Sequence, residues 1–266
     1  MKIATWNINS VRLRMPLVAQ FLEDHAPDVL MLQETKCRDS QFPASDFNAL
    51  GYTHHAINGQ KGYHGVAVVS KHPLRQIGAR DFCNAGHARH VAVELDVGGA
   101  PLRLHNFYVP AGGDEPDREI NPKFGHKLDF LDEMAVWTKA EGVAKGRAIL
   151  AGDLNIAPLE HDVWSHKALL KVVSHTPVEV DKLAKVFAAG EWVDALRRFV
   201  PDDQKLYTWW SYRAADWAAS DRGRRLDHVW VSPELGGGLQ RMEILRAARG
   251  WERPSDHVPA IVELSL

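Results

Sequence analysis

Short apolar runs, bounded by Gly, Pro or polar residues, recur along the whole chain. Runs of about four to eight such residues are typical of buried β-strands, and strict alternation is typical of strands with one exposed face. The stretch 91–97 alternates, and Gly98-Gly99 after it indicates a turn. We expect strands at residues 2–8, 29–32, 65–69, 91–97, 102–109, 148–151, 207–212, 226–231 and 258–264.

Between these runs, apolar residues recur at the three- and four-residue spacing of helices. Pro16 suits the first turn of a helix, and a second, long helix is expected from about Pro122. A third is expected over 178–189. Strands and helices mix from end to end without a repeat, a low-complexity tract or a linker, which predicts one α/β domain over residues 1–266.

Composition narrows the class of protein. The chain is 45% apolar and 25% charged, as in ordinary water-soluble proteins. No apolar run approaches the roughly 20 residues that span a membrane, and the first residues do not resemble a secretion signal. Two cysteines, Cys37 and Cys83, argue against a disulfide framework, so we expect a cytoplasmic protein without membrane association. The net charge of -2 neither indicates nor excludes nucleic-acid binding.

Polar residues interrupt the apolar runs at their ends. Glu34 follows the run 29–32, where an unpaired carboxylate is costly to desolvate. It suits a metal site, although a helix cap or an ion pair with Lys36 explains it equally well. Asn7 ends the first expected strand, and its amide either caps the following helix or holds a metal-bound carboxylate. Tyr108 ends another and is either a phosphate donor or an amphipathic core residue.

The sequence Gly152-Asp153-Leu154-Asn155 follows the run 148–151. Side chains at positions i and i+2 of an extended backbone point the same way. Asp153 is therefore placed to take a proton from a water nucleophile, while Asn155 steadies the water or a phosphate oxygen. An Asx-turn closing the strand is the alternative reading.

Two late segments carry the remaining candidates. Asp256-His257 precedes the run 258–264, and histidine suits an anionic substrate because its charge changes near neutral pH. Asp227 is placed to fix the tautomer of His257, with a surface pair to Arg224 or Arg225 as the alternative. Strand ends are where α/β folds build sites, and oxygen ligands favour hard cations. We therefore expect Mg²⁺, with Mn²⁺ as a substitute.

Five motifs together resemble a known family. The motifs are Trp6-Asn7, Leu32-Gln33-Glu34-Thr35-Lys36, Gly152-Asp153-Leu154-Asn155, Arg225-Leu226-Asp227-His228 and Ser255-Asp256-His257. They resemble the endonuclease/exonuclease/phosphatase superfamily, and within it the exonuclease III type of apurinic/apyrimidinic (AP) endonuclease. The resemblance covers nearly the whole chain and implies a four-layered α/β sandwich with two central mixed sheets flanked by helices.

The resemblance also implies roles for these residues. Glu34 would bind the metal with support from Asn7, and His257, positioned by Asp227, would contact the phosphate. The implied catalytic residues are Tyr108, Asp153, Asn155, Asp227 and His257. The implied metal site comprises Asn7, Glu34, Asp153, Asn155, Asp256 and His257. Asp256 would serve the metal side, and whether one or two ions act is left open.

Double-stranded DNA is the partner that the resemblance implies. Basic residues gather near Asp227 and before Asp256, which suits a phosphate track, with an ordinary solvated surface as the alternative. The implied DNA-binding residues are Trp209, Arg213, Arg224 and Leu226. Trp209 and Leu226 would accept an extruded baseless sugar. Arg224 stands where some relatives have an aromatic pocket wall, and Ala111 where relatives carry a larger polar residue.

We therefore expect a monomeric, Mg²⁺-dependent DNA-repair phosphodiesterase. It would cut 5′ to abasic sites and remove nucleotides or blocking groups from 3′ ends. The alternatives are a phosphatase or phosphodiesterase of the superfamily that acts on a non-DNA substrate, and a non-catalytic DNA-binding relative. The latter would lack metal-binding or water-activating residues, and all expected positions are filled.

Overall fold

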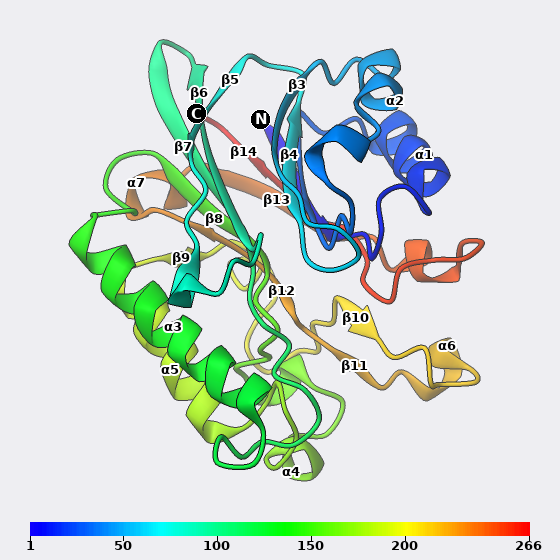
Figure 1. Cartoon of the computed structure of the whole chain (residues 1–266), viewed down its shortest axis with the longest axis vertical. Coiled ribbons are helices and arrows are strands. Elements are labelled where there is room, and N and C mark those ends of the chain that lie inside the picture. The colour runs from blue at the N-terminus through cyan, green and yellow to red at the C-terminus, as the bar shows by residue number, and fades with distance from the viewer.

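Two six-stranded mixed sheets pack face to face in the computed structural model, which describes residues 1–266 (Figure 1). The first sheet has the order β13 (Leu239–Ile244), β14 (Ala260–Leu264), β1 (Lys2–Asn7), β2 (Val29–Gln33), β4 (Val66–Ser70), β3 (His54–Asn58). The second has the order β5 (Leu74–Gly78), β6 (His90–Val97), β7 (Ala100–Tyr108), β8 (Ala148–Asp153), β12 (Asp227–Val231), β9 (Val193–Asp194). A separate two-stranded ribbon joins β10 (Trp209–Trp210) to β11 (Gly223–Arg224).

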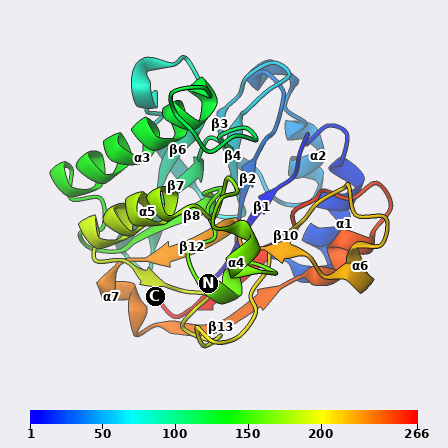
Figure 2. The same ribbon diagram turned by 90° about the horizontal axis from the view of Figure 1, so that it is seen from below.

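Helices cover the outer faces of both sheets, so the expected four-layered sandwich is confirmed (Figures 1 and 2). The first sheet is covered by α1 (Met15–His25) and α2 (Ala44–Ala49), and the second by α3 (Pro122–Ala140) and α5 (Pro177–Ala189). The shorter helices are α4 (His166–Leu169), α6 (Trp217–Ser220) and α7 (Pro233–Gly236), with 3₁₀ turns at Asp39–Gln41, Phe82–Asn84, Glu160–Asp162 and Arg246–Gly250.

Alternation along the strands divides the core into layers. In β2, Val29 and Met31 pack between the sheets, while Leu30 and Leu32 pack under α1 and α2. Both faces are buried, which explains why the sequence shows a continuous apolar run instead of alternation. The same division holds in β8, where Ile149 faces the other sheet and Leu150 faces the helices.

The expected strand at 207–212 is wrong in its extent. Only Trp209 and Trp210 pair with β11, and Trp209 also bridges to His257. The carbonyl of Trp210 accepts a hydrogen bond from Arg249 Nε, after which the chain enters a turn. A two-residue ribbon therefore stands where the aromatic run predicted a full strand.

A buried polar bridge joins the two sheets. Gln33 Nε2 donates to Asn106 Oδ1 at 2.7 Å. The Asn106 amide in turn donates to the carbonyls of Leu32 and Ala67 at 2.9 Å each. Buried amides are tolerated when they are hydrogen-bonded, and such a set fixes one sheet against the other. The bridge lies beside Glu34 in sequence and two residues before Tyr108, so it holds two site residues in register.

Candidate active site

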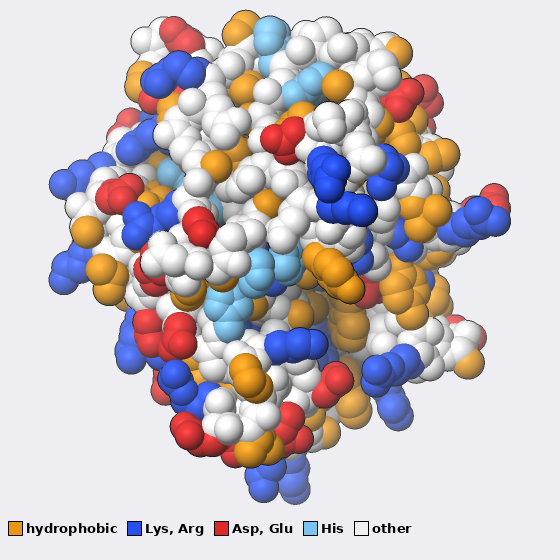
Figure 3. Space-filling view, viewed as in Figure 1, with side chains coloured by type: hydrophobic (Ala, Val, Ile, Leu, Met, Phe, Trp, Pro, Cys, Tyr) orange, Lys and Arg blue, Asp and Glu red, His pale blue; other side chains and the backbone are white.

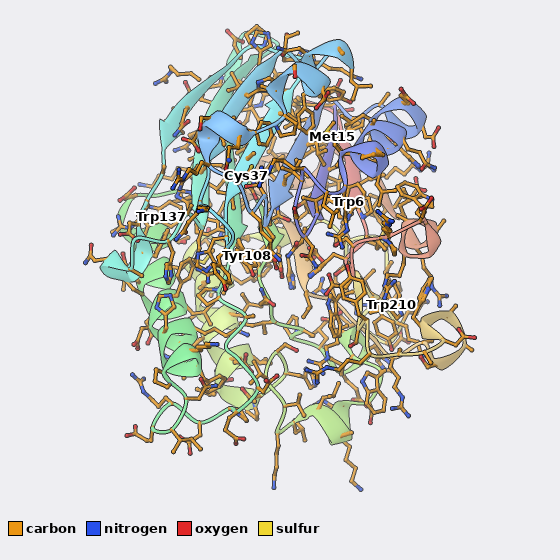
Figure 4. All side chains as sticks on the ribbon, turned by 45° about the vertical axis from the view of Figure 1, so that its right-hand side comes forward. Trp6, Met15, Cys37, Tyr108, Trp137 and Trp210 are labelled. Atoms are coloured by element: carbon orange, nitrogen blue, oxygen red, sulfur yellow. The ribbon has the colours of Figure 1, made fainter.

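Strand register brings the candidate residues together at one edge of the sandwich. Asp153 on β8 is paired with Tyr108 on parallel β7 and with Asp227 on antiparallel β12. In the other sheet, Asn7 at the end of β1 is paired with Gln33 at the end of β2, directly before Glu34. Figure 4 shows Tyr108 near the centre of the molecule and Trp210 to its right, and both residues line the same cavity.

Asp153 is the most heavily engaged side chain of the site. Its Oδ2 accepts hydrogen bonds from Asn7 Nδ2 at 2.8 Å and Asn155 Nδ2 at 3.1 Å, and its Oδ1 accepts from the Asn155 amide at 2.9 Å. Burial raises the pKa of Asp153 to about 7. The charge of His257 opposes this rise, and the carboxylates of Asp227 and Glu34 add to it. A carboxylate with a near-neutral pKa suits a general base.

Unusual backbone conformations deliver these groups to the site. Gly152 has φ of +140°, and a Cβ there would lie 2.0 Å from the carbonyl oxygen of Phe107. Only glycine permits this approach of β8 to β7. Asn155 and Glu34 have φ of 54° and 51°, in the left-handed region. Such conformations concentrate at functional sites. The Asx-turn given as the alternative for Asp153 is present, because the Asn155 backbone amide donates to Asp153 Oδ1. Asp153 takes part in this turn and in the site at the same time.

His257 lies between two carboxylates. Its Nδ1 is 2.8 Å from Asp227 Oδ2, and its Nε2 is 3.7 Å from Asp153 Oδ2. Burial alone would lower the pKa of His257, but the two carboxylates outweigh it and raise the pKa to about 10. The imidazole is therefore a cation at neutral pH. The pairing expected between Asp227 and His257 is present, and the alternative surface pair of Asp227 with an arginine is absent.

Glu34 accepts hydrogen bonds from both sheets. Asn7 Nδ2 lies 3.0 Å and the Tyr108 hydroxyl 2.8 Å from Glu34 Oε1, while Lys36 Nζ lies 2.8 Å from Oε2. Burial favours a higher pKa, but the Lys36 charge and these three donors prevail and lower the pKa of Glu34. Glu34 therefore stays ionised at neutral pH. Its ion pair with Lys36, given above as an alternative to a metal role, is present and forms part of the site.

Asp256 stands at the wall of the site. Its Oδ2 accepts from Trp209 Nε1 at 2.9 Å, and its Oδ1 accepts from Asn9 Nδ2 at 3.2 Å. The two residues of the Asp-His dipeptide therefore have separate partners. Asn9 also accepts from Lys36 Nζ at 2.6 Å, which links Asp256 to the Glu34 side of the site.

The donor set fits a hard metal ion on the Glu34 side. Asp153, Asp227 and His257 offer ligand atoms within 4.8 Å of one another. Glu34 offers an ionised carboxylate that already attracts the Lys36 ammonium, and Asn7 joins it to Asp153. Carboxylate and amide oxygens are the ligands of Mg²⁺ and Mn²⁺.

A cavity of about 650 Å³ opens over these residues. Figure 3 shows the face of the molecule hollowed near its centre, with basic and apolar side chains at the rim. All four expected DNA-binding residues line the cavity, namely Trp209, Arg213, Arg224 and Leu226. The Arg224 guanidinium stacks 5.3 Å from the centre of the Trp209 ring and donates to Val173 O and Ser174 Oγ at 3.0 and 2.8 Å.

The basic residues near Asp227 and before Asp256 were expected to form a phosphate track, and only some of them lie at this rim. Arg225 is buried and pairs with Asp162 and Asp194 at 3.0 and 2.6 Å, so it holds the fold together. Arg249 is also buried, and Arg246 pairs with Asp221. The expectation of a phosphate track from both stretches is therefore wrong for the buried Arg225 and Arg249, whereas Arg246 is exposed. Arg213, Arg222 and Arg224 do line the cavity.

The sequence assigned no role to several residues that support the site. Thr208 Oγ1 accepts from the backbone amides of Leu226 and Asp227 at 3.0 Å each, which sets the start of β12. Ser255 Oγ donates to Asn7 O at 2.7 Å and so ties the histidine segment to β1. Asn9 carried a signal, because it stands two residues after Asn7 and side chains at i and i+2 can share a face. Thr208 carried none.

The pattern of the Endonuclease/Exonuclease/phosphatase family matches residues 4–257. The chain belongs to this family. Exodeoxyribonuclease III of Haemophilus influenzae is 30% identical, with 99% of both chains covered. Exodeoxyribonuclease of Bacillus subtilis is also 30% identical, over 100% of this chain and 99% of its own. These relatives confirm the resemblance to exonuclease III-type members of the Endonuclease/Exonuclease/phosphatase family.

Solved structures of family members have the same fold. An AP endonuclease from Archaeoglobus fulgidus superimposes with a TM-score of 0.90 at 29% identity, covering 100% of both chains. A 3′ phosphatase from Neisseria, bound to a product DNA hairpin, gives 0.89 at 32% identity with the same coverage. None of the helices in this family member is both long and apolar enough to cross a membrane.

Proposed function

We propose that the protein is a metal-dependent phosphodiesterase of DNA repair that cuts 5′ to abasic sites and trims or unblocks 3′ ends. The observation that carries the proposal is the position of Asp153. Its carboxylate, held by Asn7 and Asn155, lies 3.7 Å from a cationic imidazole at the base of an open cavity. This arrangement places a base beside a charge that stabilises an anion.

Asp153 takes the proton of the attacking water in this proposal. Its pKa of about 7 makes the carboxylate both ionised and basic near neutral pH. Asn155 holds Asp153 in place, and its own side chain is fixed by a hydrogen bond from Nδ2 to Val109 O at 2.9 Å. The base is thus pre-oriented before substrate arrives, which limits the reorganisation needed for reaction.

His257 stabilises the negative charge that develops on the phosphate. Its cationic form persists through neutral pH because Asp227 and Asp153 flank it. A fixed cation in a dry site is worth more than the same charge in water. Tyr108 donates to Glu34 at 2.8 Å, and on substrate binding the same hydroxyl would donate to phosphate. Burial and the carboxylate of Glu34 raise the pKa of Tyr108, so it remains a donor.

Glu34, supported by Asn7, would hold Mg²⁺, with Mn²⁺ as a substitute and Asp153 and Asp256 toward the same side. The ion would neutralise phosphate charge and polarise the scissile bond. The chain supplies ionised oxygens at neutral pH on the Glu34 side, and it holds His257 between Asp227 and Asp153.

The cavity suits a DNA substrate. Trp209 and Leu226 offer an apolar wall beside Asp256 and His257, and Arg213, Arg222 and Arg224 offer cations for phosphates. The solved relatives support a DNA substrate. One is a 3′ phosphatase bound to a product DNA hairpin, and another is an AP endonuclease. The proposal includes a monomeric, cytoplasmic protein, in keeping with the scarcity of cysteine.

One gel assay tests the proposal with three duplexes: an abasic analogue, a 3′ phosphate and a plain recessed 3′ end. Each is incubated with Mg²⁺, with EDTA, and with the Asp153→Asn variant. The exposed Asp46→Asn variant of α2 is the matched control. We expect Mg²⁺-dependent cleavage that Asp153→Asn reduces by about 10²–10⁴-fold and Asp46→Asn leaves intact. Inert DNA together with rapid turnover of an inositol phosphate would overturn the choice of substrate.

A further inference from the structure

Three histidines from distant segments meet beside the active site. His64 precedes β4, His87 precedes β6, and His126 lies on α3. The ring centres of His64 and His87 are 4.4 Å apart, and those of His87 and His126 are 5.4 Å apart. Figure 3 shows histidine side chains gathered near the middle of the face, next to the hollow. None of the three has a role in the proposed reaction.

All three imidazoles are neutral at physiological pH. Burial, followed by the charge of Arg89, lowers the pKa of His64 to about 3. The same two causes lower the pKa of His87 and of His126. A neutral imidazole carries one nitrogen lone pair and is the commonest protein ligand for transition metals. The cluster therefore offers three lone pairs and no charge of its own.

The tautomer of His64 is fixed by its neighbour. Gln60 Oε1 accepts from the backbone amide of Ala88 at 3.0 Å, which identifies that atom as the amide oxygen. The same oxygen lies 2.9 Å from His64 Nδ1, so Nδ1 carries the proton and donates. The lone pair is thereby left on Nε2. Metal-binding histidines are typically oriented in this way, by a hydrogen bond from the nitrogen that does not bind the ion.

The other two histidines have unsatisfied nitrogens. His87 Nδ1 and His126 Nε2 are buried without a hydrogen-bond partner. Leaving such atoms unpaired in a dry environment costs roughly 1–3 kcal/mol each. A shared ligand would remove that cost for both. The carboxylates of Asp81 and Asp129 act on the pKa of these rings in the opposite direction to Arg89, with a smaller effect.

We propose that His64, His87 and His126 form a second metal site, which takes one borderline divalent ion such as Zn²⁺. With zinc–nitrogen bonds of about 2.0–2.1 Å, histidine rings sharing one ion have centres roughly 5 Å apart. The His64–His87 and His87–His126 ring spacings of 4.4 and 5.4 Å bracket that value, and His87 is the ring common to both pairs. The ligand nitrogens of the three histidines do not all lie within 4.8 Å of one another in the structure, so binding one ion requires these side chains to adopt other rotamers.

The site is chemically distinct from the oxygen-lined centre at Glu34. Nitrogen ligands select Zn²⁺, Ni²⁺ or Cu²⁺, whereas carboxylates and amide oxygens select Mg²⁺. Bound Zn²⁺ would also tie the two loops to α3 and so stabilise the folded protein by mass action. His64 packs 6.2 Å from the Tyr108 ring, so the ion would lie behind the phosphate-binding side of the cavity.

The test measures Zn²⁺ affinity of the metal-stripped full-length protein by competition with a chromophoric chelator, in excess Mg²⁺. The variants are His87→Ala and His126→Ala. One control is His72→Ala, which removes an exposed histidine paired with Asp28. A second is His166→Ala, which breaks a separate histidine pair, His166 with His175. Melting temperatures without metal confirm that each variant folds.

Loss of a residue that only hydrogen-bonds to a metal ligand weakens metal affinity by about 10–100-fold. Loss of a direct ligand is therefore expected to weaken Zn²⁺ binding by at least about 100-fold. We expect this in His87→Ala and His126→Ala and in neither control. The visible spectrum of bound Co²⁺ is expected to change in the same two variants. Wild-type affinity in both variants, or a loss that follows His166→Ala, would overturn the proposal.

Discussion

Asp153 and Asp227 lie directly opposite each other on β8 and β12, and the ring of His257 lies between their carboxylates. Two buried carboxylates this close would repel each other strongly without a cation between them. His257 supplies that cation and divides their roles. Asp227 fixes the imidazole through Nδ1, while Asp153 faces the cavity through the other side of the ring.

The pH dependence of cleavage is expected to follow these two groups. In the proposed mechanism activity requires ionised Asp153, so it rises as pH increases through about 7. It also requires protonated His257, so it falls as pH increases through about 10. Asp227→Asn removes the main charge that raises the pKa of His257, so the alkaline limb of kcat/KM moves to lower pH. An unmoved alkaline limb would contradict this role, and Asp46→Asn, exposed on α2, is the control.

Metal dependence is expected to report on Glu34. Glu34→Gln keeps the shape of the side chain but removes the charge that balances Lys36 and attracts the ion. We expect the Mg²⁺ concentration for half-maximal cleavage to rise by at least about tenfold. A Mg²⁺ titration of initial rates measures it. Glu94→Gln, which breaks the exposed pair with Arg75, should leave the titration unchanged.

Gly152→Ala is expected to destabilise the fold and the site together. The added Cβ would lie 2.0 Å from Phe107 O, between paired strands that cannot easily separate. We expect a loss of about 3 kcal/mol or more in the free energy of unfolding. Urea titration followed by circular dichroism measures it. Gly78→Ala has open space and ordinary backbone torsions, so its change should stay within about 0.5 kcal/mol.

The buried pair of Lys127 and Glu179 is expected to act as one unit. Lys127 Nζ lies 2.5 Å from Glu179 and donates to the carbonyl of Asn155 at 2.8 Å. Lys127→Met leaves a lone buried carboxylate and should reduce the free energy of unfolding by about 3–5 kcal/mol. Adding Glu179→Gln removes that charge while keeping an acceptor for the Ser174 amide.

The double variant should therefore recover most of the lost stability, which a double-mutant cycle in urea measures. Its kcat should stay below that of the unaltered protein, because the loop carrying Asn155 has lost a donor. Additive losses in the double variant would show that the two residues act independently.

Sequence patterns located the interior of both sheets and missed their borders. The eight interior strands, β14, β1, β2, β4, β6, β7, β8 and β12, all lie where apolar runs predicted them. The four border strands, β13, β3, β5 and β9, were not predicted. A border strand is exposed on one side and carries polar residues, as β5 shows with three exposed positions out of five. Its sequence therefore lacks the apolar run that identifies a strand.

Chemistry at the site was easier to predict than the partners of each side chain. Asp153, Asn155 and His257 stand in short local motifs at strand ends, and the fold brings them together. The arginine pairs could not be predicted, because Arg225 meets Asp162 and Asp194 only through tertiary packing. The spacing of charged residues along the chain does not indicate which arginines are buried.

Because β1 pairs with β14, the first strand cannot complete its sheet until the C-terminal strand has been synthesised. The N-terminal ammonium donates to Leu264 O at 2.6 Å, and Asn7 and His257 flank this first-to-last seam. A growing chain on the ribosome exposes Glu34 and Asp153 long before His257 and β14 emerge. In the proposed mechanism the cation that stabilises the phosphate is therefore among the last parts to be synthesised, so a nascent chain that ends before His257 holds no complete site.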